Sequence, residues 1–399
     1  MAAESHSNSA YRKVGETESG APRSGAGDAT VHAAPTAHMV GMDTTERRLV
    51  TVETITALTP IPDADAIESA SVRGWNVVVR KGEFATGQKV LYFEIDSALP
   101  LSDPRFAFLA ARGTKILDPG TETERVVHRL KTARLRGVYS QGLVLALTDF
   151  PEVADPHRQL LEDSLDPDSA DDWAGLLGVH KYEPPIPLSW AAQVVGEFPS
   201  FGGMRKTDSD RVQNLTGVWP AILAHGPWQA TEKVDGMSCT VFSDYSGELR
   251  VCGRGWELKD GDNVYWNTVR AYGIESWLHK GNTGVQFEIF GPGIQKNPLR
   301  VPTVRVAVFD YLVHGYPQPR FTWPRQVLAH ATPIHDLELP DTPAGAVEQV
   351  DGLTSLITPG RRAEGVVWHQ TTPTIACMEL DQRSTFKAIS NSYLVKTGG

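Results

Sequence analysis

Short apolar segments separated by turn residues fill the chain from Arg48 to about Phe150. Four of them are Leu49–Leu58, Trp75–Arg80, Lys89–Ile95 and Gly142–Leu147. Proline, glycine and aspartate lie between these segments, for example at 60–63 and 81–83. Short strands with sharp turns between them are typical of a small β-barrel. We therefore predict a β-barrel over residues 46–150.

A second set of apolar segments predicts another domain over residues 206–399. Strands are expected at Ser238–Phe242, at the start of Val285–Asn297, at Arg305–Val313, after Glu364 and at Thr385–Ile389. A helix start is expected within Lys206–Leu215, with Thr207 or Asp208 as N-cap. The fold class is therefore α+β, with a barrel followed by a domain of antiparallel sheets and flanking helices.

Two stretches lack this patterning. Residues 1–45 are rich in alanine, glycine, serine and threonine, so we expect a disordered extension. Residues 151–205 are acidic and rich in proline, which indicates a semi-rigid linker. A short helix is expected within it, at Asp168–Gly178.

The composition limits the class of protein. The chain has 399 residues, enough for two or three domains, and its 41% hydrophobic content is that of a globular protein. No apolar run approaches the length of a membrane span, so we expect no membrane partner. The three cysteines show no CxxC spacing, which favours reduced thiols in a cytoplasmic protein. The net charge of −10 argues against a protein that coats polyanions in general, but it permits a local basic surface.

The segment Glu232-Lys233-Val234-Asp235-Gly236 carries the clearest chemical signal. A lysine amine is a nucleophile only when neutral, and burial or nearby cations can lower its pKa far enough. In an extended segment Lys233 and Asp235 lie on the same face, so the carboxylate can orient the amine. Gly236 is expected to let the backbone approach a bound nucleotide. By itself, Lys-x-Asp-Gly also fits a surface turn.

The later strands each carry an isolated charged residue. Glu288 and Asp310 stand in apolar strands, Glu364 begins one, and Lys387 interrupts another, while Arg254 follows a hairpin turned at 245–247. Burying a lone charge is costly unless it is paired or lies in a solvated cleft. Taken singly, Glu288 and Asp310 could be core acids paired with arginines, and Lys387 could be a lysine at a sheet edge. Together they suit a cleft that binds a nucleoside triphosphate with a divalent metal.

The barrel carries a basic stretch free of acidic residues. It contains Arg125, Arg129, Lys131, Arg134 and Arg136. Such a run fits a solvated face, but in a barrel of the OB type, which we favour, it can also follow a phosphate backbone. Arg129, Lys131, Arg134 and Arg136 are therefore candidate nucleic-acid contacts.

The order of these motifs resembles that of the covalent nucleotidyltransferases, the superfamily of ATP-dependent ligases and GTP-dependent capping enzymes. Lys-x-Asp-Gly is followed by Phe-Glu-Ile-Phe-Gly at 287–291, Val-Phe-Asp-Tyr at 308–311, Glu-Gly-Val-Val at 364–367 and Phe-Lys at 386–387. Two further segments, 206–214 and 293–297, point more narrowly to nick-sealing RNA ligases. The chain from Arg48 to Lys396 is similar to the Deinococcus-type RNA ligases, which have an N-terminal OB module.

The resemblance implies a role for each matched residue. Lys233 would attack the α-phosphate of ATP and carry AMP covalently. Glu288 and Glu364 would bind ribose or the metal, Mg²⁺ or Mn²⁺, with support from Asp235. Glu232 would also contact the nucleotide, and Arg254 would contact the ribose or the 5′-phosphate end. Phe309 would stack on adenine, Asp310 would lie behind the site, and Lys387 would neutralise the α-phosphate.

The sequence departs from the family pattern at two positions. Thr385 stands where related ligases often have a first lysine in the last motif, and Ser238 replaces an asparagine found in some relatives. These two changes bear on phosphate contacts and on the preferred end more than on the covalent chemistry that the resemblance implies.

The function expected from this resemblance is ATP-dependent sealing of 5′-phosphate/3′-OH breaks by a monomer acting on nicked RNA or RNA–DNA duplexes. The alternatives are a GTP-dependent capping guanylyltransferase and a non-catalytic nucleic-acid binder. Capping enzymes usually carry an OB domain after the last motif, whereas here only 389–396 and a short tail follow it. A fragment that starts near Gly202 keeps every nucleotidyltransferase motif, so it is expected to form the lysyl-AMP adduct but to seal nicks poorly.

Overall fold

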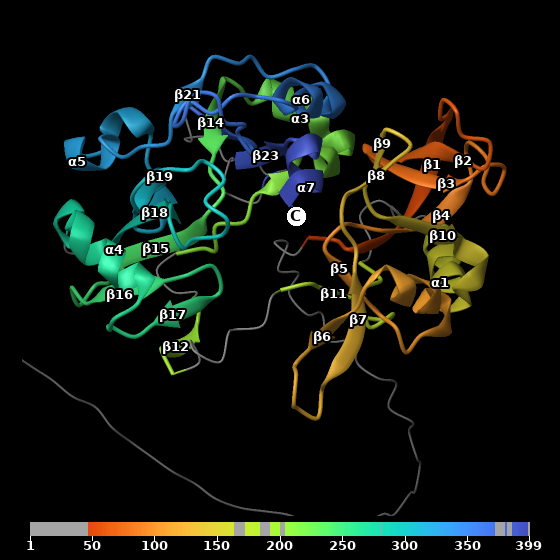
Figure 1. Cartoon of the computed structure of the whole chain (residues 1–399), viewed down its shortest axis with the longest axis horizontal. Helices are drawn as coiled ribbons and strands as arrows, with labels where there is room; N and C mark the ends of the chain where they lie inside the picture. Colours follow the sequence, from red (N-terminus) through yellow and green to blue (C-terminus); the bar gives the residue numbers. More distant parts are fainter. Residues whose placement is uncertain are drawn as a thin grey trace, which may run out of the picture. The chain divides into compact units, whose positions relative to one another are not determined.

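The computed structural model describes residues 47–162, 172–183, 192–199, 204–279, 281–371, 380 and 385–397. These residues belong to one compact unit, Thr45–Gly399 (Figure 1). The extension for which disorder is expected, 1–45, lies outside the described residues. Within the described ranges, no helix is both long and apolar enough to cross a lipid bilayer.

The N-terminal half forms two sheets and a hairpin (Figure 1). In the described residues, the first sheet has the strand order β10-β4-β1-β2-β3 and the second has the order β11-β5-β7-β6. The first contains β1 (Val50–Pro60), β2 (Ile67–Val72), β3 (Trp75–Arg80), β4 (Lys89–Phe93) and β10 (Leu143–Ala146). The second contains β5 (Ser97–Pro100), β6 (Lys115–Leu117), β7 (Arg125–Arg129) and β11 (His180–Lys181), and the hairpin pairs β8 (Ala133–Leu135) with β9 (Val138–Ser140).

Apolar side chains on the inner faces of these sheets explain why the strands form. Leu91 and Phe93 of β4 pack with Phe106 of the 3-10 helix η1 (Pro104–Arg112) and with Phe150, which follows η2 (Leu147–Asp149). All four side chains are fully buried. The strands predicted from the apolar segments are confirmed, and β3 has the predicted bounds.

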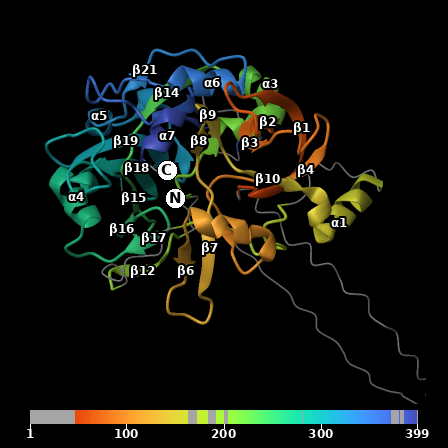
Figure 2. The same ribbon diagram turned by 45° about the vertical axis from the view of Figure 1, so that its right-hand side comes forward.

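The stretch expected to be a linker contributes, in its described residues, to the cores of both halves. Helix α1 (Pro151–Glu162) buries Val153 in the barrel core and lies beside β10 in two views (Figures 1 and 2). Strand β11 completes the second barrel sheet, and β12 (Val194–Glu197) pairs with β17 (Trp256–Leu258) of the C-terminal half. Of the helix expected at 168–178, residues 173–178 form turns and 168–171 lie outside the described residues.

The C-terminal half contains two further sheets. In the described residues, one has the order β12-β17-β16-β15-β18-β19-β20 and the other has the order β13-β23-β22-β14-β21. The first adds β15 (Met237–Ser243), β16 (Leu249–Cys252), β18 (Thr283–Phe290), β19 (Arg305–Val313) and β20 (Tyr316–Pro317). The second contains β13 (Asp210–Arg211), β14 (Trp228–Lys233), β21 (Ile334–His335), β22 (Gly365–Gln370) and β23 (Thr385–Ile389).

Short helices flank these sheets. They are η3 (Val212–Val218), α3 (Trp219–Ala224), α4 (Val264–Tyr272), η4 (Ile274–Trp277), η5 (Arg320–Thr322), α5 (Arg325–Leu328), α6 (Pro343–Val350) and α7 (Asn391–Thr397). The helix start expected with Thr207 or Asp208 as N-cap is wrong, because Asp210–Arg211 pairs with β23 as a parallel strand and the helical turn begins only at Val212.

Alternation along the five-stranded sheet separates its core face from its functional face. Ala230, Val366, Trp368 and Phe386 point to one side and pack into a core that includes residues of α3 and α6. On β14, the residues that alternate with Ala230 are Thr231 and Lys233, so this lysine lies on the opposite side from the core. The sequence pattern thus directs the reactive amine away from the apolar core.

Candidate active site

Lys233 ends β14 and forms an ion pair with Glu364, which directly precedes β22. The amine Nζ donates a 2.7 Å hydrogen bond to Glu364 Oε2, and the two side chains are 25% and 12% exposed. Their closeness follows from the antiparallel register, which pairs Lys233 with Gly365. The lysine is therefore held in place yet accessible.

Two glycines next to these residues allow close strand contacts. A Cβ at Gly236 would lie 2.2 Å from the carbonyl oxygen of Ile289, and one at Gly365 would lie 2.1 Å from that of Ala388. We expected glycine at 236 to let the backbone approach a bound nucleotide. The structure gives a different reason for glycine, because the neighbouring strand β18 already occupies the space of a side chain. Both glycines keep the strands that carry the acids in position.

Glu288 and Asp235 complete an acidic group around the amine. Burial raises the pKa of Glu288 to about 8; Lys233 opposes the shift, whereas the carboxylates of Glu364 and Asp235 add to it. Burial and Glu364 also raise the pKa of Asp235, although it accepts a 2.8 Å hydrogen bond from the Tyr393 hydroxyl. Three carboxylates thus face one ammonium, which favours the binding of an additional cation.

The same acids set the state of the nucleophile. Burial alone would lower the pKa of Lys233, but Glu364 and Glu288 outweigh it and raise the pKa above its ordinary value. The expectation that a metal and Lys387 lower this pKa concerns the site with its metal bound and stays a prediction. The amine is an ammonium at neutral pH and must lose a proton before it can attack.

Lys387 lies on β23, two strands away from Lys233 in the same sheet. Burial lowers its pKa to about 7; Asp208 counters this effect, whereas Arg211 and Lys233 add to it. Arg211 is directly paired with Lys387 in the parallel β13–β23 register. The two cationic side chains therefore project from the same side of the sheet.

The carboxylate of Glu232 makes contacts different from those of Lys233. It is 2% exposed and accepts hydrogen bonds from the Ser355 hydroxyl and, at 2.7 Å, from the Leu356 backbone N–H. His335 Nε2 lies 3.3 Å from it. Since neighbouring strand residues face opposite sides, Glu232 anchors the 355–356 turn rather than extending beside the amine.

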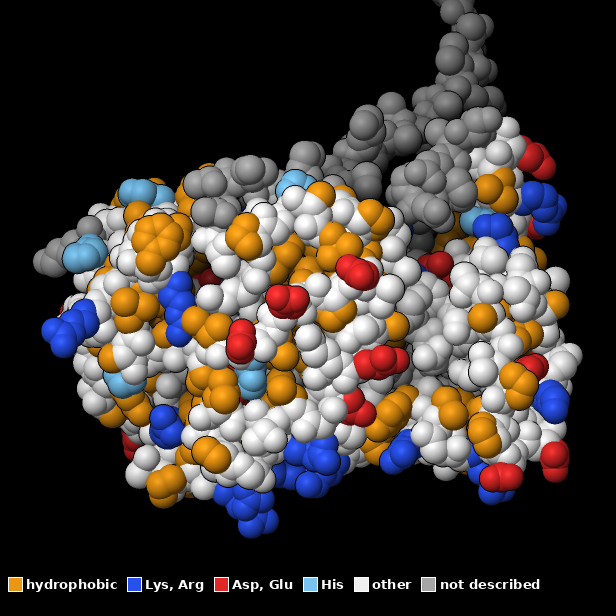
Figure 3. All heavy atoms as spheres, turned by 90° about the horizontal axis from the view of Figure 1, so that it is seen from above, with side chains coloured by type: hydrophobic (Ala, Val, Ile, Leu, Met, Phe, Trp, Pro, Cys, Tyr) orange, Lys and Arg blue, Asp and Glu red, His pale blue; other side chains and the backbone are white. Residues whose placement is uncertain are grey.

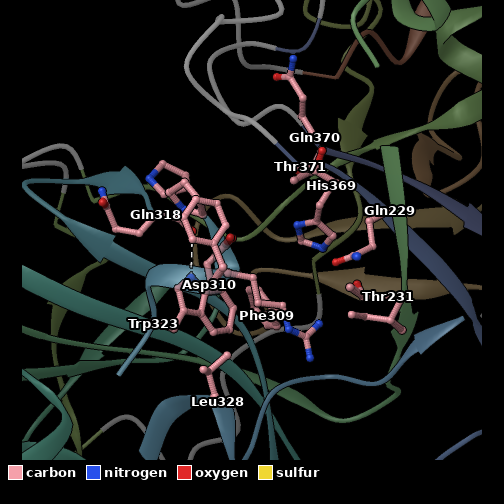
Figure 4. A pocket seen from close by; sticks show the side chains of 16 residues that line it. Gln229, Thr231, Phe309, Asp310, Gln318, Trp323, Leu328, His369, Gln370 and Thr371 are labelled. Carbon is pink, nitrogen blue, oxygen red and sulfur yellow. Dashed lines mark hydrogen bonds between the residues drawn. The ribbon is translucent and has the colours of Figure 1, made fainter. Parts of the chain in front are cut away.

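A pocket of about 360 Å³ opens between the two C-terminal sheets (Figure 4). Gln229, Thr231 and His369 line it from the five-stranded sheet, and Phe309 and Trp323 line it from the other side. Phe309 is the extra residue of a β-bulge, because Val308 and Asp310 pair with the consecutive residues 287 and 286. Bulges redirect a side chain, and here the half-buried ring enters the pocket instead of the core. Thr231 is two residues before Lys233 on the same face of β14, so the pocket and the amine lie on the same face of the sheet.

The comparisons with known proteins agree with this geometry. A family model described as RNA ligase matches residues 226–389, and one described as an OB-fold domain matches 49–147. No curated protein sequence matches the chain. A solved structure of a mutant Naegleria gruberi RNA ligase without ligand is 34% identical, with a TM-score of 0.71, and covers 88% of this chain and 98% of that one. The chain belongs to the RNA ligase family.

Two further structures of the Naegleria gruberi RNA ligase show what that protein binds. One contains PPi and is 34% identical, with a TM-score of 0.70 and coverage of 88% and 99%. The other, a lysine-to-alanine mutant with ATP and Mn, is 34% identical, with a TM-score of 0.70 and coverage of 87% and 98%. The predicted order of an OB-fold domain followed by a sheet-rich catalytic domain is confirmed for this ligase.

Arg254 of the ligase contacts an acid that the sequence reasoning did not assign. Its Nη2 lies 2.8 Å from Asp208 Oδ1, and Lys181 Nζ of β11 lies 2.9 Å from Oδ2. Burial alone would raise the pKa of Asp208, but Lys387, Arg254 and Lys181 together lower it below its usual range. Arg254 is thus tied to the segment that precedes β13. In the sequence, Asp208 stood out only as a possible N-cap of the expected helix.

The candidate nucleic-acid residues of the barrel have different surroundings. Arg129 Nη2 lies 2.6 Å from Asp96 Oδ1, whereas Arg134 is exposed and stacks over Tyr139 with 5.4 Å between guanidinium and ring centre. Arg136 and Gly137 both have positive φ in the β8–β9 turn, which leaves Arg136 exposed at its tip. On the face in Figure 3, basic and acidic side chains are interspersed.

Lys131 lies between strands β7 and β8 of the barrel. Burial lowers its pKa, and Arg129, Lys115 and Lys296 add to this effect. Because Lys296 belongs to the loop after β18, this interaction places basic side chains of both halves near each other. The structure therefore brings together Lys233, Asp235, Glu288, Glu364 and Lys387. Arg134 and Arg136 belong to the β8–β9 hairpin of the barrel, and Arg129 pairs with Asp96.

Replacing Glu288 by glutamine is expected to stabilise the ligase and impair its activity. The folded state holds the Glu288 proton up to about pH 8, whereas the unfolded chain releases it near 4.5, so wild-type stability from this group falls as pH rises through that window. Glutamine does not titrate. Without ATP and metal, the advantage of Glu288→Gln should grow from near zero at pH 5 to on the order of 2–4 kcal/mol above pH 8.

Thermal unfolding across this pH range measures the difference. Glu197→Gln, at an exposed position of β12 in the same sheet, is the control. A pH-independent difference between Glu288→Gln and wild type would contradict the raised pKa.

Proposed function

We propose that the ligase uses ATP and a divalent cation to seal 5′-phosphate/3′-OH breaks through AMP attached to Lys233. The observation that carries this proposal is the Lys233 amine, held 2.7 Å from Glu364 beside a pocket that displays Phe309. The structures of the Naegleria gruberi ligase with ATP and Mn, and with PPi, support the same nucleotide and leaving group for this chain.

In the first step, Lys233 Nζ loses a proton and attacks the α-phosphorus of ATP. Glu364 accepts the hydrogen bond from this amine and is placed to take the proton. The new P–N bond replaces the bond from the α-phosphorus to the bridging oxygen, and pyrophosphate leaves with the electron pair. Lys387 stabilises the negative charge that develops on the phosphate oxygens.

In the next two steps the same residues act on the 5′-phosphate of a nucleic acid. A 5′-phosphate oxygen attacks the phosphorus of the lysyl-AMP, so the P–N bond breaks and Lys233 regains a proton. A 3′-OH then loses its proton to water and attacks the phosphorus of the activated 5′-phosphate. The new phosphodiester P–O bond replaces the bond to AMP, which leaves with the electron pair. This chemistry requires a phosphate end and a hydroxyl end held together, which a nicked RNA or RNA–DNA duplex provides.

Glu288 and Glu364 are suited to hold the divalent cation. Carboxylate oxygens suit Mg²⁺ and Mn²⁺, and Mg²⁺ is commonly held by one or two carboxylates together with substrate phosphates. Burial raises the pKa of Glu288, and the charges of Glu364 and Asp235 add to this shift. A cation would relieve the repulsion among these groups. Among the described residues, no group of three or more ligating side chains is close enough to hold an ion alone, which fits a site completed by phosphate. The cation would offset the carboxylate charge that keeps Lys233 protonated.

Incubation with labelled ATP or GTP, followed by denaturing electrophoresis, tests the proposal. We expect label on the protein from α-labelled ATP, none from γ-labelled ATP, and sealing of a nicked duplex with an RNA 3′-OH strand. Label from GTP alone would support a capping enzyme, and the absence of any adduct would support a non-catalytic binder.

Phe309→Ala is expected to weaken ATP use far more than it destabilises the fold. The ring lines the pocket and is not part of an apolar core. Loss of base stacking should cost about 1–3 kcal/mol, or roughly 5- to 150-fold in the ATP concentration needed for half-maximal adduct formation. A large drop in melting temperature with unchanged ATP dependence would instead assign Phe309 to the core. Phe321→Ala, an exposed aromatic at the same pocket, serves as a comparison.

Neutralising Lys131 and Arg134 to glutamine is expected to weaken nick sealing in a salt-dependent way. Each phosphate contact removed should lower the slope of log affinity against log salt by about one. Adding Arg129→Gln should weaken sealing further, but this change also breaks the pair with Asp96. Duplex binding measured across a salt series checks the result. An unchanged slope in the double variant would show that these residues form a solvated face only.

A further inference from the structure

Tyr393 lies on α7, the short helix that follows β23, and outside the motifs that mark the nucleotide site. Its side chain is buried, with 7% exposed. The hydroxyl donates a 2.8 Å hydrogen bond to Oδ2 of Asp235, in the connection between β14 and β15. Helix α7 therefore contacts the connection that directly follows the nucleophile.

This hydrogen bond controls how the Asp235 carboxylate is oriented. Asp235 is half-buried, and within the described part of the chain Tyr393 supplies the only hydrogen bond to its side chain. The last torsion of an aspartate is broad, so a single donor decides where its oxygens point. Burial, followed by the charge of Asp235, raises the pKa of the Tyr393 hydroxyl, which therefore stays a donor.

The start of α7 also holds the second acid beside the lysine. The backbone N–H of Ser390 donates a 2.9 Å hydrogen bond to the carbonyl oxygen of Glu364. The backbone N–H of Tyr393 donates in turn to Ser390 Oγ at 3.2 Å. The charges of both acids, Glu364 and Asp235, act on Lys233. One short segment, 390–393, thus contacts two members of the acidic group.

Asp351, at the end of α6, fixes this segment. Its Oδ1 accepts hydrogen bonds from the Ser390 hydroxyl at 2.7 Å and from the Ser392 backbone N–H at 3.0 Å. Burial alone would raise the pKa of Asp351, but these hydrogen bonds lower it, so the group is a carboxylate at neutral pH. The first turn of α7, and with it the Tyr393 ring, is therefore held from the core side of the sheet's flanking helix.

The acceptor distinguishes Tyr393 from a tyrosine that serves only the fold. A buried tyrosine usually finds a hydrogen-bond partner, and the backbone often supplies it. Tyr272 of α4 is such a case, because its hydroxyl donates to the carbonyl oxygen of Val304 at 3.1 Å. Tyr393 instead donates to a carboxylate of the active site.

We propose that Tyr393 is a positioning residue that fixes the Asp235 carboxylate beside Lys233, so that α7 completes the acidic group of the active site. A carboxylate that is already oriented does not have to turn as charge develops on the phosphate, and such preorganisation lowers the barrier. Tyr393 acts through Asp235 and has no need to touch the nucleotide. This inference rests on the proposed function.

Tyr393→Phe in the full-length ligase tests the inference, because it removes the hydroxyl and keeps the ring. Single-turnover adduct formation at saturating ATP should slow by about 10-fold, the lower end of the loss seen when a residue that orients an active-site ligand is removed. The residues that line the pocket do not include Asp235 or Tyr393. The ATP concentration for half-maximal rate should therefore stay within about twofold of wild type.

Tyr272→Phe is the matched control, since it also removes a hydroxyl that donates a hydrogen bond in the same half of the chain. Its melting temperature should be close to that of Tyr393→Phe, and its rate of adduct formation should equal that of wild type. A purely structural role for Tyr393 would give the two variants the same behaviour.

A double mutant tests whether the hydroxyl acts through Asp235. In an Asp235→Asn background, Tyr393→Phe should slow adduct formation further by no more than about twofold. Denaturant unfolding of wild type, both single variants and the double variant gives the coupling of the two groups even where adduct formation by Asp235→Asn is too slow to follow. We expect non-additive stabilities.

Four outcomes would overturn the inference while leaving the proposed function intact. They are a wild-type rate for Tyr393→Phe, a raised ATP requirement with an unchanged maximal rate, additive effects of the two changes, and a melting temperature for Tyr393→Phe far below that of Tyr272→Phe. Failure of the wild-type ligase to form an adduct would instead refute the proposed function.

Discussion

Replacing Lys233 with alanine is expected to abolish transfer of label from ATP to the ligase. In the proposed mechanism the amine forms the P–N bond, and Glu364, its hydrogen-bond partner, cannot form a phosphoramidate. Lys233→Arg should be equally inactive, because a guanidinium stays protonated near neutral pH. The measurement is labelled adduct on a denaturing gel, with a loss of at least about 10³-fold expected for removal of a covalent nucleophile.

Two controls make this result specific. Lys259→Ala removes an exposed lysine on the same half of the chain and should leave the adduct unchanged. Lys233→Ala should still seal a nick that already carries a 5′-adenylate, because that step needs no lysyl-AMP. Label retained on Lys233→Ala would assign the nucleophile to another residue.

Lys387→Met is expected to slow adduct formation by about 10²–10³-fold, the range found when a preorganised group at the developing charge is removed. The same change should stabilise the ligand-free protein. The pKa of about 7 lies below the ordinary 10.5, so the folded state binds fewer protons than the unfolded chain between these values, and wild-type stability from this group rises with pH across them. The advantage of methionine should therefore be largest below pH 7 and shrink toward pH 10.5.

Single-turnover adduct formation and thermal unfolding over this pH range check both effects. Lys396→Met, at an exposed position of α7, is the control and should change neither. A variant that loses activity and stability together would show that Lys387 serves the fold rather than the phosphate.

Much of the catalytic half could be predicted from the sequence because its strands are visible as local apolar segments. The strands β19 and β23 have the predicted bounds, and an isolated charge inside each apolar strand marked the cleft. Lys233, Glu288, Glu364 and Lys387 meet because strand register fixes their neighbours once the sheets form. The assignment of roles also depended on the order of the family motifs.

Contacts between distant segments could not be predicted in this way. The pairs of Asp96 with Arg211 and of Asp208 with Arg254 join charges far apart in the sequence, and nothing local distinguishes them from solvated surface residues. The parallel pairing of β13 with β23 overrides a segment whose capping residues favour a helix. The direction of Glu232 likewise depends on the turn at 355–356, which only the tertiary fold supplies.

The connection between β14 and β15 has a consequence for how substrates are exchanged. Only residues 234–236 separate Lys233 in one sheet from Met237 in the other, a span of at most about 14 Å. Any hinge motion that parts the two sheets would have its pivot near this connection. The amine would then move little, while Phe309 and the outer wall of the pocket would swing through a longer arc. Pyrophosphate could depart and a nicked duplex could enter while the AMP on Lys233 stayed close to the axis of rotation.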